Sequence, residues 1–256
     1  MKNKYEKQYR KILKKAIKKG IYRQDRTGVG CSSLFNESIK VNVGKRFPII
    51  TGRKMFEKTF NTEFDWFING ETNIQRFKDA GVKIWDAWAD ENGNLGPVYG
   101  YQMRNFNGQG FDQLYRLISD LITNPDSRRH IISLWNPNQL DKMALPPCYL
   151  YFQFFVDKGR LNMFVVQRSG DLFLGIPYDI ALFTKILLYV ASLTDLKAGK
   201  LEVQIIDAHV YSNQLEAVKK YLKTDIYSLP KYKYKKGSLS LINYKHGPVI
   251  SAKVAI

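Results

Sequence analysis

Residues 149–168, YLYFQFFVDKGRLNMFVVQR, carry the pattern that decides the fold. Two strand-like runs, 149–157 and 160–168, follow each other so closely that no helix fits between them. Other strand-like runs lie near 30–43, 129–136, 201–211 and 238–243, and helix-period segments lie near 3–19, 55–69, 111–123, 178–193 and 213–222. The middle of the chain therefore lacks βαβ alternation. This order predicts an α+β fold with a large mixed sheet flanked by helices.

Length and composition limit the class of protein. The 256 residues are 45% hydrophobic, which is enough for one sizeable core. Repeats, low-complexity tracts and clear linkers are not apparent, so residues 1–256 are expected to form a single domain. The lysine-rich residues 1–20 lack an apolar signal core, and no apolar run approaches the roughly 20 residues that span a bilayer. The two cysteines, Cys31 and Cys148, have no metal-type spacing, which favours a reduced, cytoplasmic protein without a metal site.

The formal net charge of +17 suits polyanionic partners such as nucleic acid, nucleotides or polyglutamylated cofactors. The lysines are spread along the chain without a known nucleic-acid-binding motif, so a solvated basic surface is the simpler interpretation. Apolar residues in the segment 3–19 recur at helical intervals. That segment is therefore predicted to be an amphipathic helix with a basic outer face.

Cys148 lies in MALPPCYLYFQFFV (143–156), between two prolines and a strand of alternating aromatics. A free cysteine is usually a small buried hydrophobe, but its thiolate is a strong nucleophile where cations lower the pKa. PDSRRHIISLW (125–135) supplies Arg128 and Arg129, and VVQRSGDLFLG (165–175) supplies Arg168. Such arginines, with Arg26 in RTG, could bind a phosphate through forked hydrogen bonds, although arginines at turns are commonly only solvated.

Seven segments then occur in one order over nearly the whole chain. They are DRTGVG (25–30), EFDWFINGETNI (63–74), IWDAWADENGNLGPVYGYQMR (84–104), NPDSRRHIISLWNPNQLDKMALPPC (124–148), QRSGDLFLGIPYDIA (167–181), DAHVYSNQ (207–214) and VAI (254–256). Together they resemble the thymidylate synthase family. The resemblance implies a homodimer packed sheet to sheet, and the one-carbon donor 5,10-methylenetetrahydrofolate. It also implies that Cys148 adds to C6 of a pyrimidine nucleotide, so that C5 becomes the carbon nucleophile.

The resemblance also implies roles for individual residues. Cys148 matches the nucleophile, Glu63 the carboxylate that organises water and relays protons, and Tyr99 the residue near the C5 proton. The matching nucleotide ligands are Arg26, Arg168 and Ser169 at the phosphate, Arg128 and Arg129 reaching it from the other subunit, His209 and Tyr211 at the sugar 3′-hydroxyl, and Gln167. The folate and base pocket matches Trp85, Trp88, Leu145, Asp171, Gly175, Tyr178 and Ile256, with Arg53 near the folate tail. In an unrelated chain, Trp85 and Trp88 would be core aromatics, Glu63 a surface carboxylate and His209 a core histidine.

Two positions depart from the family pattern at the edge of the base. Asp179 stands where thymidylate synthases have Asn, and Tyr149 stands where they have His directly after the nucleophile. An Asn amide can accept a hydrogen bond from N3–H of uracil and donate one to O4, whereas an ionised Asp can only accept hydrogen bonds. The Asp179 carboxylate can accept a hydrogen bond from N4–H of cytosine, and a proton shared between Asp179 and N3 completes a second hydrogen bond. The simpler interpretation is that Asp179, in the first turn of the helix 178–193, only complements the helix dipole.

These departures favour a cytidylate, dCMP, as substrate and 5-hydroxymethyl-dCMP as product. The phage deoxycytidylate hydroxymethylases in the family likewise have Asp at the matching position and no His after the nucleophile, which suggests a virus-encoded enzyme. Leu145, the PPC motif and the terminal VAI are closer to true synthases, so methylation of dCMP with release of dihydrofolate stays open. Ordinary thymidylate synthesis from dUMP and a nucleic-acid-binding role are further alternatives.

Overall fold

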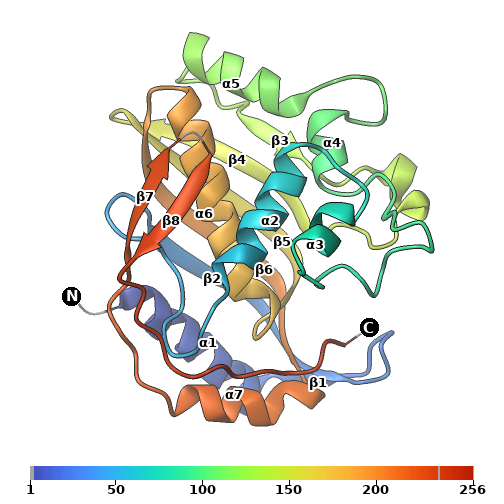
Figure 1. The fold of residues 1–256 in the computed structure, drawn as a ribbon, viewed down its shortest axis with the longest axis vertical. Coiled ribbons are helices and arrows are strands. Elements are labelled where there is room, and N and C mark those ends of the chain that lie inside the picture. Colours follow the sequence, from blue (N-terminus) through green and yellow to red (C-terminus); the bar gives the residue numbers. More distant parts are fainter. Residues whose placement is uncertain (1–2, 236, 256) are drawn as a thin grey trace.

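The computed structural model describes residues 3–235 and 237–255, and a six-stranded sheet forms its centre (Figure 1). Its strands are β1 (Ile21–Arg23), β2 (Cys31–Asn42), β3 (Ile131–Ser133), β4 (Tyr149–Asp157), β5 (Arg160–Asp171) and β6 (Lys197–Tyr211), in the spatial order β1-β2-β6-β5-β4-β3. Neighbouring strands are antiparallel except β5 and β6, which are parallel. The sheet is thus mixed, and the α+β prediction is confirmed.

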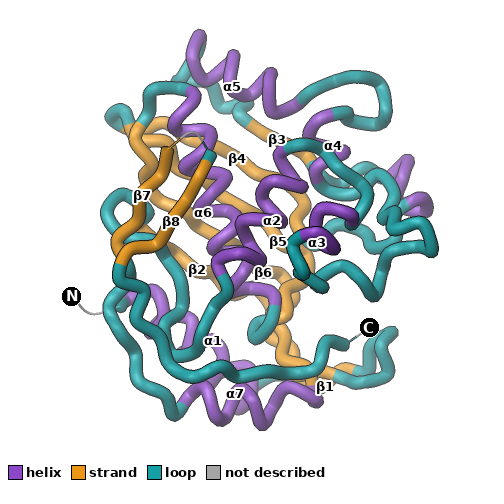
Figure 2. Tube along the Cα trace, in the orientation of Figure 1, coloured by secondary structure: helices purple, strands orange, loops and turns teal. Residues whose placement is uncertain are grey.

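Helix α6 (Gly175–Leu193) lies on one face of this sheet, against β5 and β6, and α2 (Glu57–Ile68) packs on α6. Figure 2 shows both helices in front of the strands. By length and apolar composition α6 could cross a membrane, which corrects the expectation that no apolar run comes near that length. However, 78% of its most apolar window is buried inside the protein, as in the core helix of a globular fold.

The start of α6 also differs from the prediction. The helix begins at Gly175 rather than near residue 178, and Pro177 lies in its first turn. Proline is tolerated there because the first N–H groups of a helix have no intrahelical acceptor. Asp179 consequently lies beyond the first turn. The helix dipole falls off within that turn, so it no longer accounts for an acidic residue at this position.

Helix α1 (Lys4–Lys19) is amphipathic, as predicted. Asn3 caps it by accepting from the Glu6 N–H, and its apolar side joins the core. The Gln8 side chain bonds to the backbone of β2, donating to the Ser38 carbonyl at 3.1 Å and accepting from the Lys40 N–H at 3.2 Å. These bonds satisfy part of a strand edge that β1 leaves open.

The opposite face of the sheet is only partly covered. Along β5, Met163 and Val165 are buried while Phe164 and Val166 stay partly exposed. Phe155 on β4 is 64% exposed, and Ile131 on β3 is 45% exposed. Within residues 3–235 and 237–255, no helix therefore shields this apolar face as α6 shields the other.

The remaining elements are short or peripheral. They are α3 (Gln75–Asp79), α4 (Gly100–Arg104), α5 (Gln113–Thr123), α7 (Leu215–Leu222), the hairpin β7 (Lys231–Lys235) and β8 (Ser238–Ile242), and the 3-10 helices Pro137–Lys142 and Ser212–Gln214. Among the α-helices and strands of the whole fold, α3, α4, β1 and β7 are not predicted from the sequence. They are three to five residues long, which is too short to establish a hydrophobic period. The strand predicted over 129–136 is shorter in the structure, where β3 covers only Ile131–Ser133. The strand predicted to begin at 201 begins four residues earlier, at Lys197, as β6.

Candidate active site

Cys148 lies directly before β4, at the end of the loop that carries Pro146 and Pro147. Arg168 on β5 holds this loop: its Nε donates to the Pro147 carbonyl at 2.9 Å and its Nη2 to the Pro146 carbonyl at 2.8 Å. Burial raises the pKa of the Cys148 thiol, and the positive charges of Arg168 and Arg26 offset that only in part. The arginines therefore act in the expected direction, but burial outweighs them and the net pKa of the thiol is raised.

Tyr99 contacts the same loop from the start of α4. Its hydroxyl accepts a hydrogen bond from the Cys148 N–H at 3.1 Å. Its backbone has φ 32°, which is rare for a residue with a side chain and costs conformational energy. Burial raises the pKa of the Tyr99 phenol, so the hydroxyl stays protonated and available beside Cys148.

The two residues that depart from the family pattern bond to each other. The Tyr149 hydroxyl donates to Asp179 Oδ1 at 2.9 Å, and Gln167 Nε2 donates to Asp179 Oδ2 at 2.9 Å. Tyr149 and Gln167 are paired across β4 and β5, so both donors reach the carboxylate from adjacent strands. Burial raises the pKa of Asp179 to about 6, although both hydrogen bonds lower it. This arrangement is called the carboxylate clamp below.

Glu63 projects from α2 and is buried. Burial raises the pKa of its carboxyl to about 8; the nearby negative charge of Asp179 adds to this, and the Trp85 side chain opposes it. Among the described residues, the buried indole N–H of Trp88 has no acceptor at hydrogen-bond distance, whereas the Trp85 indole interacts with the Glu63 carboxyl. A buried donor without a partner is rare in native proteins, so the Trp88 N–H is suited to a ligand or an ordered water.

The parallel pairing of β5 and β6 brings a second group of predicted residues together. Ser169 pairs with Asp207, and Asp171 pairs with His209. His209 is buried against Tyr211, with ring centroids 4.8 Å apart, and its Nδ1 lies 3.3 Å from the Asp207 carboxylate. Burial lowers the pKa of His209, but the nearby carboxylates raise it further, so the net direction is upward.

Asp171 fixes the loop between β5 and α6. Its Oδ1 accepts from the Phe173 and Leu174 N–H groups, and its Oδ2 accepts from Gln214 at 2.7 Å. Asp207 and Gln214 were not among the predicted site residues. Both lie in the segment DAHVYSNQ, next to the residues that were, so proximity in sequence was the only available signal.

Several residues predicted to line the folate and base pocket make contacts other than those expected, or are only partly buried. The Arg53 guanidinium is buried, stacks 4.7 Å from the Phe173 ring centroid and donates to the Phe173 carbonyl at 2.7 Å. It therefore does not face solvent, where a folate tail would approach. The Tyr178 hydroxyl accepts from the Phe56 N–H at 3.3 Å. Leu145 and Gly175 are partly buried, and Ile256 lies outside the described residues.

Arg128 and Arg129 are exposed and do not join Cys148 in the same chain. They precede β3, and the next residue, His130, accepts a backbone hydrogen bond from Phe154. Arg129 therefore lies beside Phe155, seven residues along β4 from Cys148. At about 3.3 Å per strand residue, this separates Arg129 from the thiol by about 23 Å. An arginine side chain does not span that distance.

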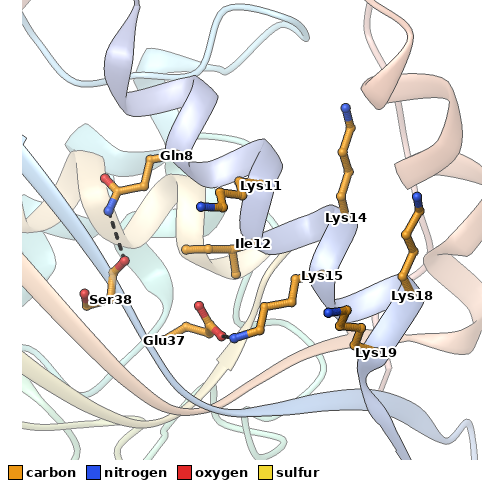
Figure 3. Close-up of a pocket in the computed structure, with 9 residues that line it drawn as sticks. All are labelled: Gln8, Lys11, Ile12, Lys14, Lys15, Lys18, Lys19, Glu37 and Ser38. Carbon is orange, nitrogen blue, oxygen red and sulfur yellow. Dashed lines mark hydrogen bonds and ion pairs between the residues drawn. The ribbon is translucent and has the colours of Figure 1, made fainter.

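A basic hollow of about 620 Å³ lies on α1, away from Cys148 (Figure 3). It is lined by Gln8, Lys11, Ile12, Lys14, Lys15, Lys18, Lys19, Glu37 and Ser38. Lys15 forms an ion pair with Glu37, while Lys14 and Lys18 point away from that pair. The described residues contain no group of three or more His, Cys, Asp or Glu side chains placed to hold a metal ion.

Known proteins resemble this chain over nearly its whole length. The family model described as thymidylate synthase matches residues 7–256. Two curated relatives named thymidylate synthase, from Coxiella burnetii strains Dugway 5J108-111 and RSA 331 / Henzerling II, are each 41% identical over 263 residues. The alignments cover 98% of this chain and the full length of each relative.

Proposed function

Because the chain belongs to the thymidylate synthase family, whose members transfer a one-carbon unit from methylenetetrahydrofolate to a pyrimidine nucleotide, we propose dCMP as its nucleotide substrate and 5-hydroxymethyl-dCMP as its product. The observation that carries the proposal is the carboxylate clamp. Asp179 accepts one hydrogen bond on each oxygen, from Tyr149 and from Gln167. Each oxygen keeps a lone pair for the base, and the group offers acceptors only while it is ionised.

The clamp suits a cytosine edge that carries an extra proton. Cytosine protonated at N3 presents N3–H and N4–H side by side, and a carboxylate accepts from both, as it does from an arginine fork. The proton comes from solvent when the nucleotide binds and is shared between N3 and Asp179. When Cys148 adds to C6, electron density moves onto the ring, and this proton neutralises it where charge develops.

The covalent steps then follow in order. The Cys148 thiolate forms a bond to C6, and C5 attacks the methylene carbon of the activated folate. Loss of the C5 proton expels tetrahydrofolate and leaves an exocyclic methylene. Water adds to that methylene and loses a proton, the double bond returns to C5–C6, and the C6–S bond breaks. The alternative is hydride transfer from the folate, which gives 5-methyl-dCMP and dihydrofolate.

Glu63 and Tyr99 are the proton-handling residues in this proposal. With a pKa of about 8, Glu63 is largely protonated at neutral pH and can hold and orient water near the methylene. The Tyr99 hydroxyl lies 3.1 Å from the Cys148 N–H, beside the reacting carbons of a C6 adduct. Trp85, beside the Glu63 carboxyl, and Trp88, whose N–H has no acceptor among the described residues, form the wall against which the folate would lie.

We also propose a homodimer that completes the phosphate site. Arg26, Arg168 and Ser169 come from one chain, while Arg128 and Arg129 come from the partner, because their own Cys148 is out of reach. The partly exposed apolar face with Ile131, Phe155 and Phe164 is the surface that a second copy would cover. Arg168 would exchange its bonds to the proline carbonyls for bonds to phosphate, which would free the nucleophile loop to adjust.

A nucleic-acid-binding role is the second candidate function, and the lysine-lined hollow on α1 is the observation that favours it. Cys148→Ser separates the two roles. Loss of turnover with unchanged RNA affinity assigns the function to catalysis, whereas salt-sensitive RNA binding by a wild-type chain without turnover would favour the second candidate.

The experiment that tests the proposed function compares dCMP, dUMP and CMP as substrates with methylenetetrahydrofolate. Product mass distinguishes hydroxymethyl from methyl, and the absorbance of dihydrofolate reports hydride transfer. We expect dCMP to be consumed fastest, with a hydroxymethyl product and no dihydrofolate. A methyl product with dihydrofolate would replace hydroxymethylation by methylation, and preference for dUMP would overturn the assignment of the base.

A further inference from the structure

Tyr149 is held rigidly at the base edge of the site. Its side chain is 5% exposed, and its ring packs against Tyr99 and Phe183 with centroids 4.9 and 4.8 Å away. Within the described part of the chain, the hydroxyl donates to Asp179 Oδ1. Gln167 is fully buried and donates to the other oxygen, so the carboxylate is fixed in orientation from two strands.

We propose that Tyr149 is a positioning residue for substrate choice: its hydroxyl keeps Asp179 in the carboxylate form, and thereby selects a cytosine edge over a uracil edge. This inference rests on the proposed function, because it explains how the dCMP preference is set. It assigns Tyr149 an action through Asp179 rather than a direct contact with the nucleotide.

The physical argument compares what each base demands of Asp179. Uracil presents one donor, N3–H, and one acceptor, O4, so the residue facing it must offer an acceptor and a donor. Asp179 can do that only as a neutral acid. One oxygen then becomes a hydroxyl, and the hydrogen bond from Tyr149 or Gln167 to that oxygen is weakened. N3-protonated cytosine presents two donors and leaves both clamp bonds intact. Hydrogen bonds to an ionised acceptor are roughly twice as strong as neutral ones, so the clamp penalises uracil.

The two hydrogen bonds of the clamp lower the pKa of Asp179, whereas its other surroundings raise it. Burial raises the pKa of Asp179 and the Asp171 carboxylate adds to the increase. The titratable groups that face it are Glu63 from α2, Tyr99 from the start of α4, Cys148 from the loop before β4, Tyr149 from β4, and Asp171 from β5. Removing the Tyr149 hydroxyl leaves these effects opposed by Gln167 alone. The pKa of Asp179 therefore rises from about 6 in that variant, and the neutral acid becomes accessible at neutral pH.

The test is Tyr149→Phe, which keeps the ring and removes only the hydroxyl. The measured quantity is the ratio of kcat/KM for dCMP to kcat/KM for dUMP between about pH 5 and about pH 9. We expect this ratio to fall about tenfold at neutral pH, because one charge-assisted hydrogen bond is lost. We also expect the pH at which the ratio changes to move upward. Tyr115→Phe is the matched control, since Tyr115 is 73% exposed on α5.

The outcomes separate this inference from the proposed function. Wild-type protein that prefers dUMP contradicts the proposed function itself. Wild-type protein that prefers dCMP, with an unchanged ratio and pH profile in Tyr149→Phe, shows that the hydroxyl only packs and overturns the inference. Should Tyr149→Phe fold poorly, Gln167→Leu removes the other clamp bond. The ratio must then fall in the same direction, and an unchanged ratio there overturns the inference equally.

Discussion

Glu6 and Asp179 are both carboxylates in the interior, but they differ in how many donors reach them. Glu6 is fully buried, and six donors converge on it. They are the N–H and hydroxyl of Thr51, the Gly52 N–H, the Tyr221 hydroxyl, and the Asn3 and Arg10 side chains. Of the residues that the structure describes, only Tyr149 and Gln167 donate to Asp179, and this residue is partly exposed.

This difference separates a structural carboxylate from one able to bind a ligand. A carboxylate has about four acceptor sites, so Glu6 is saturated. Its bonds tie α1 to the loop 51–52 and to α7, beside the C-terminal segment that pairs with this loop through Gly247 and Pro248. Figure 1 shows that segment running past α1 and α7. Asp179 has acceptor capacity left over, and it lies near enough to Cys148 for its charge to raise the thiol pKa. Unused hydrogen-bonding capacity in a buried group is therefore the mark of the site.

The largest expected effect is on stability, at Glu6. In Glu6→Ala, several buried donors lose their acceptor, and we expect unfolding to become easier by about 3–5 kcal/mol in urea titrations. Glu216→Ala on α7 is the control, because Glu216 is exposed and its loss should leave the urea midpoint unchanged. A Glu6→Ala protein as stable as the control would break the comparison.

Asp179→Asn should act on substrate choice instead. The amide presents the donor and acceptor that uracil needs, so we expect preference to move from dCMP towards dUMP by about a hundredfold. The stability should change by about 1 kcal/mol or less. Glu6→Gln is the matched amide substitution at the other carboxylate and should leave the substrate ratio untouched. If Glu6→Gln also changed the preference for dCMP over dUMP, Glu6 would influence substrate choice as well, and the comparison of the two carboxylates would fail.

Glu63 is a third carboxyl in the interior, and fewer hydrogen-bond donors among the described residues reach it than reach Glu6 or Asp179. Its pKa is raised to about 8, so the folded protein binds a proton that the unfolded chain releases above pH 4.5. This group's contribution to stability is therefore full below about pH 4.5 and is lost as pH rises through about 8. Glu63→Gln should flatten the dependence of the urea midpoint on pH across that window and lower turnover about a hundredfold. An unchanged pH dependence would remove Glu63 from the set of functional carboxyls.

The smallest expected effect is a recovery of activity on mixing. If Arg128 and Arg129 serve the partner's site, Arg129→Ala and Cys148→Ser should each be nearly inactive alone. Random exchange of subunits would make half of the dimers mixed, each with one intact site, so we expect about a quarter of wild-type activity. Size-exclusion chromatography before and after mixing checks that dimers are present. Failure to recover any activity would place the arginines outside the partner's site.

Much of the fold could be read from sequence because its signals are local. The runs 149–157 and 160–168 are rich in aromatic and apolar residues and are separated by only two residues, and the apolar stripe of α1 recurs at helical spacing, so the sequence predicts both. The sequence predicts the start of α6 three residues too late, because a proline such as Pro177 is not tolerated in a helix interior and favours a loop before the helix. Proline in a first turn is compatible with a helix, and the sequence alone does not distinguish the two.

The site was predicted only in its parts, because its decisive contacts join residues far apart in sequence. Tyr149 and Asp179 were each singled out as departures from a family pattern, but the bond between them spans 30 positions. The role of Glu6 was missed for the same reason. On α1 it is one acidic residue on a basic helix, and four of its six donors come from two distant segments, residues 51–52 and Tyr221. Arg53 was placed by family position, whereas packing on Phe173 turns it inward.

The central claim is that the Asp179 carboxylate reads a cytosine edge by sharing one proton with it, and proton uptake on binding tests this most directly. Calorimetry of dCMP binding to Cys148→Ser, in two buffers of different ionisation enthalpy, counts the protons without covalent chemistry. Near pH 7.5, about one unit and a half above the Asp179 pKa of about 6, we predict an uptake of about one proton per dCMP bound. The same measurement on Cys148→Ser combined with Asp179→Asn should give close to none. Tight dCMP binding without proton uptake, or an uptake that survives Asp179→Asn, would contradict the account.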